Sequence, residues 1–145
     1  MSLEAKVKNI VVEVVHKIRP ESSAQEAAVR MLEKDIGCLV VSGAQGPIGM
    51  ITERDILRKV TAARIDPSKV RVGDIMSTPL ISVTPEASVG DAAKKMIDYH
   101  IKRLAVMVED GTFLGLVTMT DVIRWMAKQK ELTESLVNYL SYDVP

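Results

Sequence analysis

The chain has 145 residues, of which 47% are hydrophobic and 26% charged, so it can bury the core of a globular protein. Nineteen basic residues balance nineteen acidic ones, which argues against binding to nucleic acid or to an anionic membrane. The one cysteine, Cys38, excludes an internal disulfide, and neither a membrane span nor a secretory signal is recognisable. We therefore expect a soluble, cytoplasmic protein.

An internal repeat organises the sequence. At a shift of 65 residues Pro20 aligns with Pro85, and at a shift of 66 the stretch "GMITERDILR" at 49–58 aligns with "GLVTMTDVIR" at 115–124. Two copies are too few for a solenoid, so we predict a pseudo-symmetric pair. The expected divisions are a first repeat at 5–61, a linker at 62–69, a second repeat at 70–127 and a C-terminal tail at 128–145.

Each repeat is predicted to begin with a strand and a helix. The strands are expected at Val11–Ile18 and Leu80–Val83, where each apolar stretch precedes a proline. The helices follow because apolar residues recur at i, i+3, i+4, i+7 and i+8. These residues are Ala24, Ala27, Ala28, Met31 and Leu32 in the first repeat, and Val89, Ala92, Ala93, Met96 and Ile97 in the second.

Two further strands and a second helix complete each repeat. The continuous apolar runs "CLVV" and "LAVMV" are typical of buried strands, and the runs "IGMI" and "FLGLV" return after a turn. The last helix begins at Thr52 or Thr118. The predicted fold is therefore α/β (α+β), with the order strand, helix, strand, strand, helix in each repeat.

The repeated T-x-x-D motif has two interpretations. Thr52 with Asp55, and Thr118 with Asp121, have the spacing of a capping box, which would only stabilise a helix start. The same geometry favours an anion beside the unpaired backbone N–H groups, and the carboxylate could accept hydrogen bonds from the vicinal hydroxyls of a ribose. Gly49, and Gly115 in the second repeat, would let a flat base approach the preceding strand.

Two copies of G-h-h-T-x-x-D (h, apolar), each after an apolar strand, and a doubled Pro-Glu resemble the tandem CBS-domain pair, or Bateman module, of stand-alone prokaryotic proteins. The resemblance covers roughly Ala5 to Ala127. It implies two CBS repeats packed through their sheets, without catalytic activity, forming a homodimer and signalling to an unknown partner protein. It also implies a regulatory adenine nucleotide, AMP above ADP or ATP, rather than a catalytic cofactor. A sensor of S-adenosyl compounds and a scaffold without a ligand are the alternatives.

The resemblance also implies two clefts that combine residues of both repeats. Cleft one would take Met50, Thr52, Arg54, Asp55, Leu80, Ile81, Lys102 and Arg103, with the basic residues at the phosphate. Cleft two, with little charge at its phosphate end, would bind more weakly and would take Val15, His16, Gly37, Cys38, Leu116, Thr118, Thr120 and Asp121.

Simpler interpretations compete for several of these residues. Lys102 and Arg103 could be solvated residues at the start of a strand, and Arg54 could form an ion pair on its helix. His16 and Cys38 have the sequence surroundings of packed residues, and no base is tied to the thiol by any pattern. No metal-binding pattern or catalytic triad is recognisable. The tail is expected to be an amphipathic helix or a frayed end.

Overall fold

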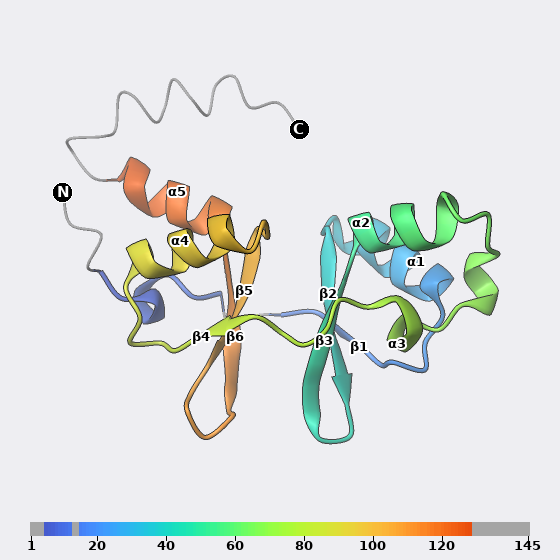
Figure 1. The fold of residues 1–145 in the computed structure, drawn as a ribbon, viewed down its shortest axis with the longest axis horizontal. Coiled ribbons are helices and arrows are strands. Elements are labelled where there is room, and N and C mark those ends of the chain that lie inside the picture. The colour runs from blue at the N-terminus through green and yellow to red at the C-terminus, as the bar shows by residue number, and fades with distance from the viewer. Residues whose placement is uncertain (1–4, 13–14, 129–145) are drawn as a thin grey trace. The chain divides into compact units, whose positions relative to one another are not determined.

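The computed structural model describes residues 5–12 and 15–128, and the chain in it forms two compact units (Figure 1). Unit 1 consists of Met1–Glu13 with Ser82–Pro145, and unit 2 of Val14–Ile81. The predicted C-terminal tail lies almost wholly outside the described residues. Among the described residues, no helix has both the length and the apolar character needed to span a membrane.

Unit 2 contains a three-stranded sheet in the order β1-β2-β3. β1 runs parallel to β2, and β2 runs antiparallel to β3 with Cys38 opposite Thr52. The elements of unit 2 are β1 (Lys17–Ile18), α1 (Ala24–Lys34), β2 (Cys38–Gly43), β3 (Gly46–Thr52), α2 (Glu53–Ile56), the π-helical turn η2 (Leu57–Thr61), the 3-10 turn η3 (Pro67–Lys69) and α3 (Val72–Ile75).

Unit 1 repeats this plan with the sheet order β4-β5-β6. β4 is parallel to β5, and β5 is antiparallel to β6 with Arg103 opposite Thr118. The elements of unit 1 are the 3-10 turn η1 (Val7–Asn9), β4 (Ser82–Val83), α4 (Val89–Asp98), β5 (Arg103–Met107), β6 (Phe113–Thr118) and α5 (Met119–Ala127). The chain is thus a mixed α/β protein with two three-stranded sheets, as predicted.

The helices α1 and α4 form where predicted, but their buried stripes are narrower. Ser23 and Ser88 cap them by accepting the backbone N–H three residues later. The buried side chains are Ala24, Ala27 and Met31 in α1 and Val89, Ala92 and Met96 in α4. The predicted stripes also included two residues that prove to be exposed, Leu32 at 82% and Ile97 at 64%. Both lie at the margin of the stripe, where a residue at i+8 has rotated away from the sheet.

The first strand of each repeat is shorter than predicted. In the described residues, Lys17–Ile18 pairs with β2 and Ser82–Val83 pairs with β5, while Val12 of the first predicted strand forms an isolated bridge to Leu116 of β6. In both repeats a basic side chain reinforces this short strand: Arg30 donates a 2.8 Å hydrogen bond to the Lys17 carbonyl, and Lys95 donates one of 2.5 Å to the Ser82 carbonyl.

The segment preceding each short strand packs with the helix of the other sequence repeat. In unit 1, the N–H of Val7 donates to the Ala87 carbonyl at 2.8 Å, and in unit 2 the N–H of Val72 donates to the Ser22 carbonyl at 2.7 Å. The two pairs are equivalent at the 65-residue shift. Figure 1 shows the blue N-terminal segment beside α4 and the yellow-green α3 beside α1. Each unit is therefore built from both sequence repeats.

An ion pair anchors the N-terminal segment further. Lys6 Nζ lies 2.8 Å from Glu86 Oε2, and Lys8 Nζ lies 3.4 Å from Oε1. The hydrogen bond from Lys6 and the charges of both lysines hold the pKa of Glu86 below its ordinary value. All three side chains are about half exposed, so the contribution to stability is small.

Candidate functional site

The T-x-x-D motifs form complete capping boxes at the starts of α2 and α5. The N–H of Asp55 donates to Thr52 Oγ1 at 3.2 Å, and the N–H of Thr52 donates to Asp55 Oδ2 at 3.0 Å. The corresponding distances for Thr118 and Asp121 are 3.1 and 2.9 Å. The capping interpretation of the sequence is therefore confirmed. A carboxylate that caps a helix can also accept hydrogen bonds from a ligand, so the cap does not rule out the ligand interpretation. The cap also fixes each carboxylate in one orientation.

Asp55 has further partners in unit 2. Its carboxylate accepts hydrogen bonds from Thr52 Oγ1 at 3.1 Å and from Ser77 Oγ at 3.0 Å, and Lys59 Nζ lies 3.2 Å from Oδ1. The same lysine donates to the Ile75 carbonyl at 2.9 Å. Asp55 is 6% exposed, so an ionised carboxylate needs these donors to offset its burial.

Asp121 in unit 1 is less fully bonded. Its carboxylate accepts from Thr118 Oγ1 at 2.8 Å, and Arg124 NH1 lies 3.4 Å from Oδ1. The Arg124 side chain is 65% exposed, so this long contact is weak. Within the described part of unit 1, one oxygen of Asp121 therefore keeps most of its capacity to accept hydrogen bonds.

Backbone pairing explains the difference between the two carboxylates. Met50 pairs with Ser77 through two hydrogen bonds of 2.9 and 2.8 Å, and Leu116 pairs in the same way with Val12 at 3.1 and 2.9 Å. Ser77 and Val12 are therefore equivalent positions. A hydroxyl reaches the carboxylate in unit 2, whereas an aliphatic side chain occupies the equivalent place in unit 1.

The glycines of the motif have a role that differs from the predicted one. A Cβ on Gly49 would lie 2.8 Å from both Met76 Sδ and the Ser77 carbonyl oxygen. A Cβ on Gly115 would overlap the Val12 carbonyl oxygen. The space that we predicted for a flat base is filled by the chain itself, so these glycines allow the close approach of two backbone segments.

The predicted cleft-one residues divide between the units. Met50 is buried in β3, Arg54 is exposed on α2, and Leu80 and Ile81 are half-buried just before β4. Lys102 is exposed and Arg103 is half-buried at the start of β5, where the Lys102 carbonyl accepts from the N–H of Met119 at 2.9 Å. Within unit 1 this basic pair is therefore a neighbour of the Thr118 cap.

The predicted cleft-two residues divide in the same way. Gly37 and Cys38 are half-buried in unit 2, where the Gly37 carbonyl accepts from the N–H of Glu53 at 3.0 Å. Val15 is half-buried, and the carbonyl of His16 accepts from the N–H of Val40. Leu116 is buried in β6 of unit 1, and Thr120 is exposed on α5. Sequence reasoning missed Ser77, although its alignment with Val12 was available as a signal.

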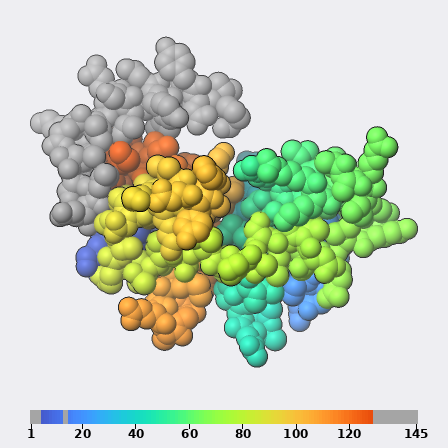
Figure 2. All heavy atoms as spheres, in the orientation of Figure 1, coloured from blue at the N-terminus to red at the C-terminus, as the bar shows by residue number. Residues whose placement is uncertain are grey.

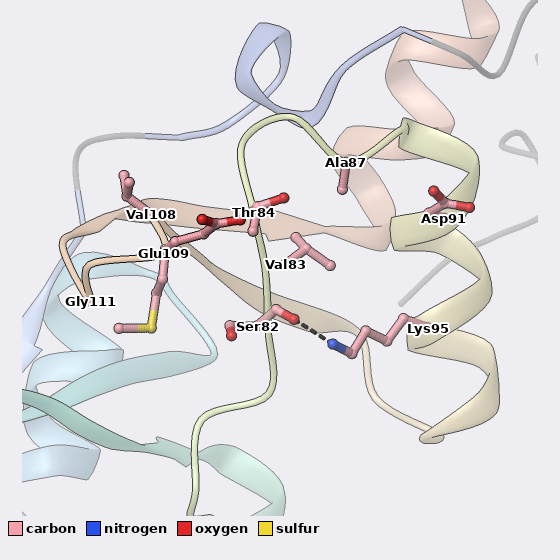
Figure 3. A pocket seen from close by; sticks show the side chains of 10 residues that line it. Ser82, Val83, Thr84, Ala87, Asp91, Lys95, Val108, Glu109 and Gly111 are labelled. Carbon is pink, nitrogen blue, oxygen red and sulfur yellow. Dashed lines mark hydrogen bonds between the residues drawn. The ribbon is translucent and has the colours of Figure 1, made fainter.

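Two surface pockets lie away from these carboxylates. One, of about 600 Å³ in unit 1, is lined by β4, α4 and the β5–β6 turn, including Asp91, Lys95 and Glu109 (Figure 3). Lys95 points to the Ser82 carbonyl there, as Arg30 does toward Lys17 in unit 2, so its role is structural. The other, of about 460 Å³ in unit 2, lies between α1 and α2. Over residues 5–12 and 15–128, no cluster of three potential metal ligands occurs.

Comparison with known proteins identifies the family. The CBS-domain family model matches residues 7–62 and 72–128, so the chain belongs to the CBS-domain family and carries two copies of the domain. An uncharacterized protein of Methanopyrus kandleri, MK0525, is 40% identical over 106 residues, which are 72% of this chain and 54% of that protein. The chain thus spans about half the length of this curated relative.

Solved structures show the same fold. An uncharacterized conserved protein from Pyrococcus horikoshii has a TM-score of 0.81 and 28% identity, over 89% of this chain and 97% of that one. The CBS-domain protein PAE2072 from Pyrobaculum aerophilum, complexed with AMP, has a TM-score of 0.74 and 21% identity, over 92% of this chain and 98% of that one. The two matches of the family model show that the chain is a tandem CBS pair, as the sequence predicted, and the solved structures share its fold.

Proposed function

We propose that this chain is a non-catalytic regulatory module that binds an adenine nucleotide, with AMP as the favoured ligand, and signals to a partner protein. The observation that carries the proposal is the pair of fixed carboxylates, Asp55 and Asp121, each oriented by its own threonine at a helix start. A carboxylate whose orientation is already fixed loses no rotamer freedom of its own when it accepts hydrogen bonds from the vicinal hydroxyls of a ribose. The AMP complex of a protein with the same fold is compatible with this ligand.

The phosphate end of the ligand remains a prediction. Lys102, Arg103 and Arg54 are the cations that the sequence indicates, and a guanidinium can bind a phosphate through two parallel hydrogen bonds. The first two lie in unit 1 and the third in unit 2. Substitutions in both units are therefore needed to test this part of the proposal.

Calorimetric titration tests the proposal. The full chain, freed of retained nucleotide, is titrated with AMP, ADP, ATP and S-adenosylmethionine, and then the Asp55→Asn, Asp121→Asn and Arg103→Ala variants are titrated with the best ligand. We expect micromolar binding of AMP that weakens at least about tenfold in Arg103→Ala, because a charge-assisted hydrogen bond to phosphate is lost.

The matched control is Asp98→Asn. This acid is exposed on α4, where it pairs with Lys94 at 2.9 Å, and its loss should leave AMP affinity unchanged. If the wild-type chain binds none of the four compounds, the scaffold alternative replaces the nucleotide sensor. If S-adenosylmethionine binds more tightly than AMP, a sensor of S-adenosyl compounds replaces the AMP sensor as the proposed function.

A further inference from the structure

The Asp55 carboxylate is saturated by donors from its own chain. A carboxylate offers about four lone-pair positions. In unit 2 they face four groups: the N–H and hydroxyl of Thr52 and the hydroxyl of Ser77, which donate hydrogen bonds, and the ammonium of Lys59, which forms an ion pair at 3.2 Å. A ribose that presents two hydroxyls to Asp55 therefore needs two of these donors to leave.

The four donors differ in how readily they can leave. The two groups of Thr52 belong to the helix cap, and their loss would disrupt the start of α2. Lys59 has a side chain that is 45% exposed, and Ser77 is exposed, so water can replace the carboxylate as their partner. The donors that can be displaced are thus Lys59 and Ser77.

We propose that Lys59 and Ser77 are specificity-determining residues that compete with the ligand for Asp55, so that vicinal hydroxyls bind this carboxylate only by displacing them. This inference rests on the proposed function and adds a regulatory consequence to it. The two residues also hold the segment 75–77 to α2 and η2, through the Ile75 carbonyl and the Ser77 hydroxyl. Figure 2 shows these parts of the chain adjoining on the surface of unit 2. Ligand binding at Asp55 would release both side-chain contacts at once.

Unit 1 contains the natural comparison. Its position equivalent to Ser77 is Val12, and the residue four places after Asp121 is Trp125 rather than a lysine. Val12 has no hydroxyl, so the hydrogen bond from Ser77 to Asp55 has no counterpart at Asp121, and the charge of Lys59 has no counterpart at position 125. The competition therefore distinguishes Asp55 from Asp121, although the two motifs are otherwise equivalent.

The test compares AMP with 2′-deoxyAMP. All proteins carry Asp121→Asn, so that Asp55 is the remaining T-x-x-D acid, and all are checked by thermal melting. The readout is the ratio of the affinities for AMP and 2′-deoxyAMP, in which any effect of Lys59 on the phosphate cancels. AMP presents two ribose hydroxyls to Asp55 and 2′-deoxyAMP presents one, so AMP needs one more lone pair of the carboxylate. Ser77→Ala and Lys59→Met each free a lone pair, and we expect each to raise the ratio roughly three- to tenfold.

Two variants serve as controls. Ser77→Thr keeps the hydroxyl and should keep the parental ratio. Lys94→Met removes another lysine that pairs with an aspartate at i+4, on an exposed face of α4, and should also leave the ratio unchanged.

The outcomes separate this inference from the proposed function. If the parental protein binds AMP and the ratio stays constant or falls in Ser77→Ala and Lys59→Met, the competition is refuted while nucleotide binding stands. If a protein that carries both Ser77→Ala and Lys59→Met binds AMP and the parental and wild-type proteins do not, the competition holds and the proposed function fails. Absence of binding in every protein overturns both.

Discussion

At the residue scale, two aspartates with the same backbone role have different surroundings. The spacing of Thr and Asp predicts both caps from the sequence, since a cap depends on residues three positions apart. The Ser77 contact to Asp55 spans 22 residues and depends on how the segment before β4 packs. Local pattern therefore predicts the shared part of the site, whereas the difference between Asp55 and Asp121 requires the tertiary structure.

The different bonding of the two acids predicts different costs of substitution. Asp55→Asn removes the negative charge that pairs with Lys59 and places an amide NH2 group, itself a donor, against the donors that surround the side chain. We therefore expect the free energy of unfolding to fall by about 2–3 kcal/mol. Asp121→Asn keeps an acceptor for the cap and loses a long, exposed contact, so we expect about 1 kcal/mol or less. Urea unfolding followed by circular dichroism measures both, and equal losses would contradict the described difference.

The glycines of the motif lead to a second prediction. Gly115→Ala would force a methyl group against the Val12 backbone, which cannot move as a flexible side chain does. We expect a loss of about 2–3 kcal/mol, and a smaller loss for Gly49→Ala, where part of the clash is with the movable Met76 side chain. The measurement is the same urea titration.

Gly43→Ala is the matched control for these glycines. It lies in a strand, and its new methyl group would meet only the Ile48 side chain at 3.7 Å, an ordinary contact distance. We expect stability to change by less than about 0.5 kcal/mol. A large loss at Gly43 with a small one at Gly115 would refute the close-approach explanation.

At the element scale, periodicity predicts α1 and α4 well but overestimates their buried width. Ala24, Ala27 and Met31 face the core as predicted, whereas Leu32 does not. Hydrophobicity alone cannot separate a residue that faces the core from one at the edge of the same stripe. The predicted strand Val11–Ile18 was too long for a related reason, because an apolar run does not reveal how many residues find a neighbouring strand.

The short strands β1 and β4 depend on side-chain support. Lys95→Met would leave the Ser82 carbonyl without its side-chain donor, and we expect a loss of about 1 kcal/mol. Arg30→Met should behave alike in unit 2. Hydrogen exchange of the amides of β5, measured beside global unfolding, shows whether the loss is local.

Lys94→Met is the neighbouring control for this prediction. Lys94 forms an exposed i,i+4 pair with Asp98, which is worth about 0.3–0.5 kcal/mol. If Lys94→Met destabilises the protein as much as Lys95→Met does, the contact to the β4 carbonyl has no special role.

At the scale of the whole molecule, the sequence predicts the number and order of the repeats but not their exchange of first segments. The 65-residue shift is the same whether a segment packs on its own repeat or on the other. The deciding contacts are backbone hydrogen bonds, such as Val7 to Ala87, and these carry no side-chain signature. The repeated Pro-Glu marks equivalent positions without showing which segment lies against them.

Self-association is a prediction at this scale. The groove between α1 and α2 has two largely exposed leucines at its rim, Leu32 at 82% and Leu57 at 61%. Exposed apolar surface of this kind marks interfaces. We propose that the chain forms a homodimer, and we expect Leu32→Asp with Leu57→Asp to shift it to monomer in analytical ultracentrifugation.

Ile65→Asp is the matched control for the homodimer. Ile65 is 45% exposed but lies beyond η2, and it does not line the groove. The dimer should persist in this variant. A wild-type chain that sediments as a monomer at micromolar concentration would refute the homodimer.

The exchange of segments has a consequence for the order in which the protein can form during synthesis. Residues 5–12 leave the ribosome before the rest of both units, and their hydrogen-bonding partners at Pro85, Ala87 and Leu116 are made much later. Unit 2 consists of consecutive residues up to Ile81, so all three of its strands are synthesised before any strand of unit 1. Residues 5–12 therefore cannot form all of their native contacts until unit 2 has been synthesised completely and unit 1 has been synthesised through β6.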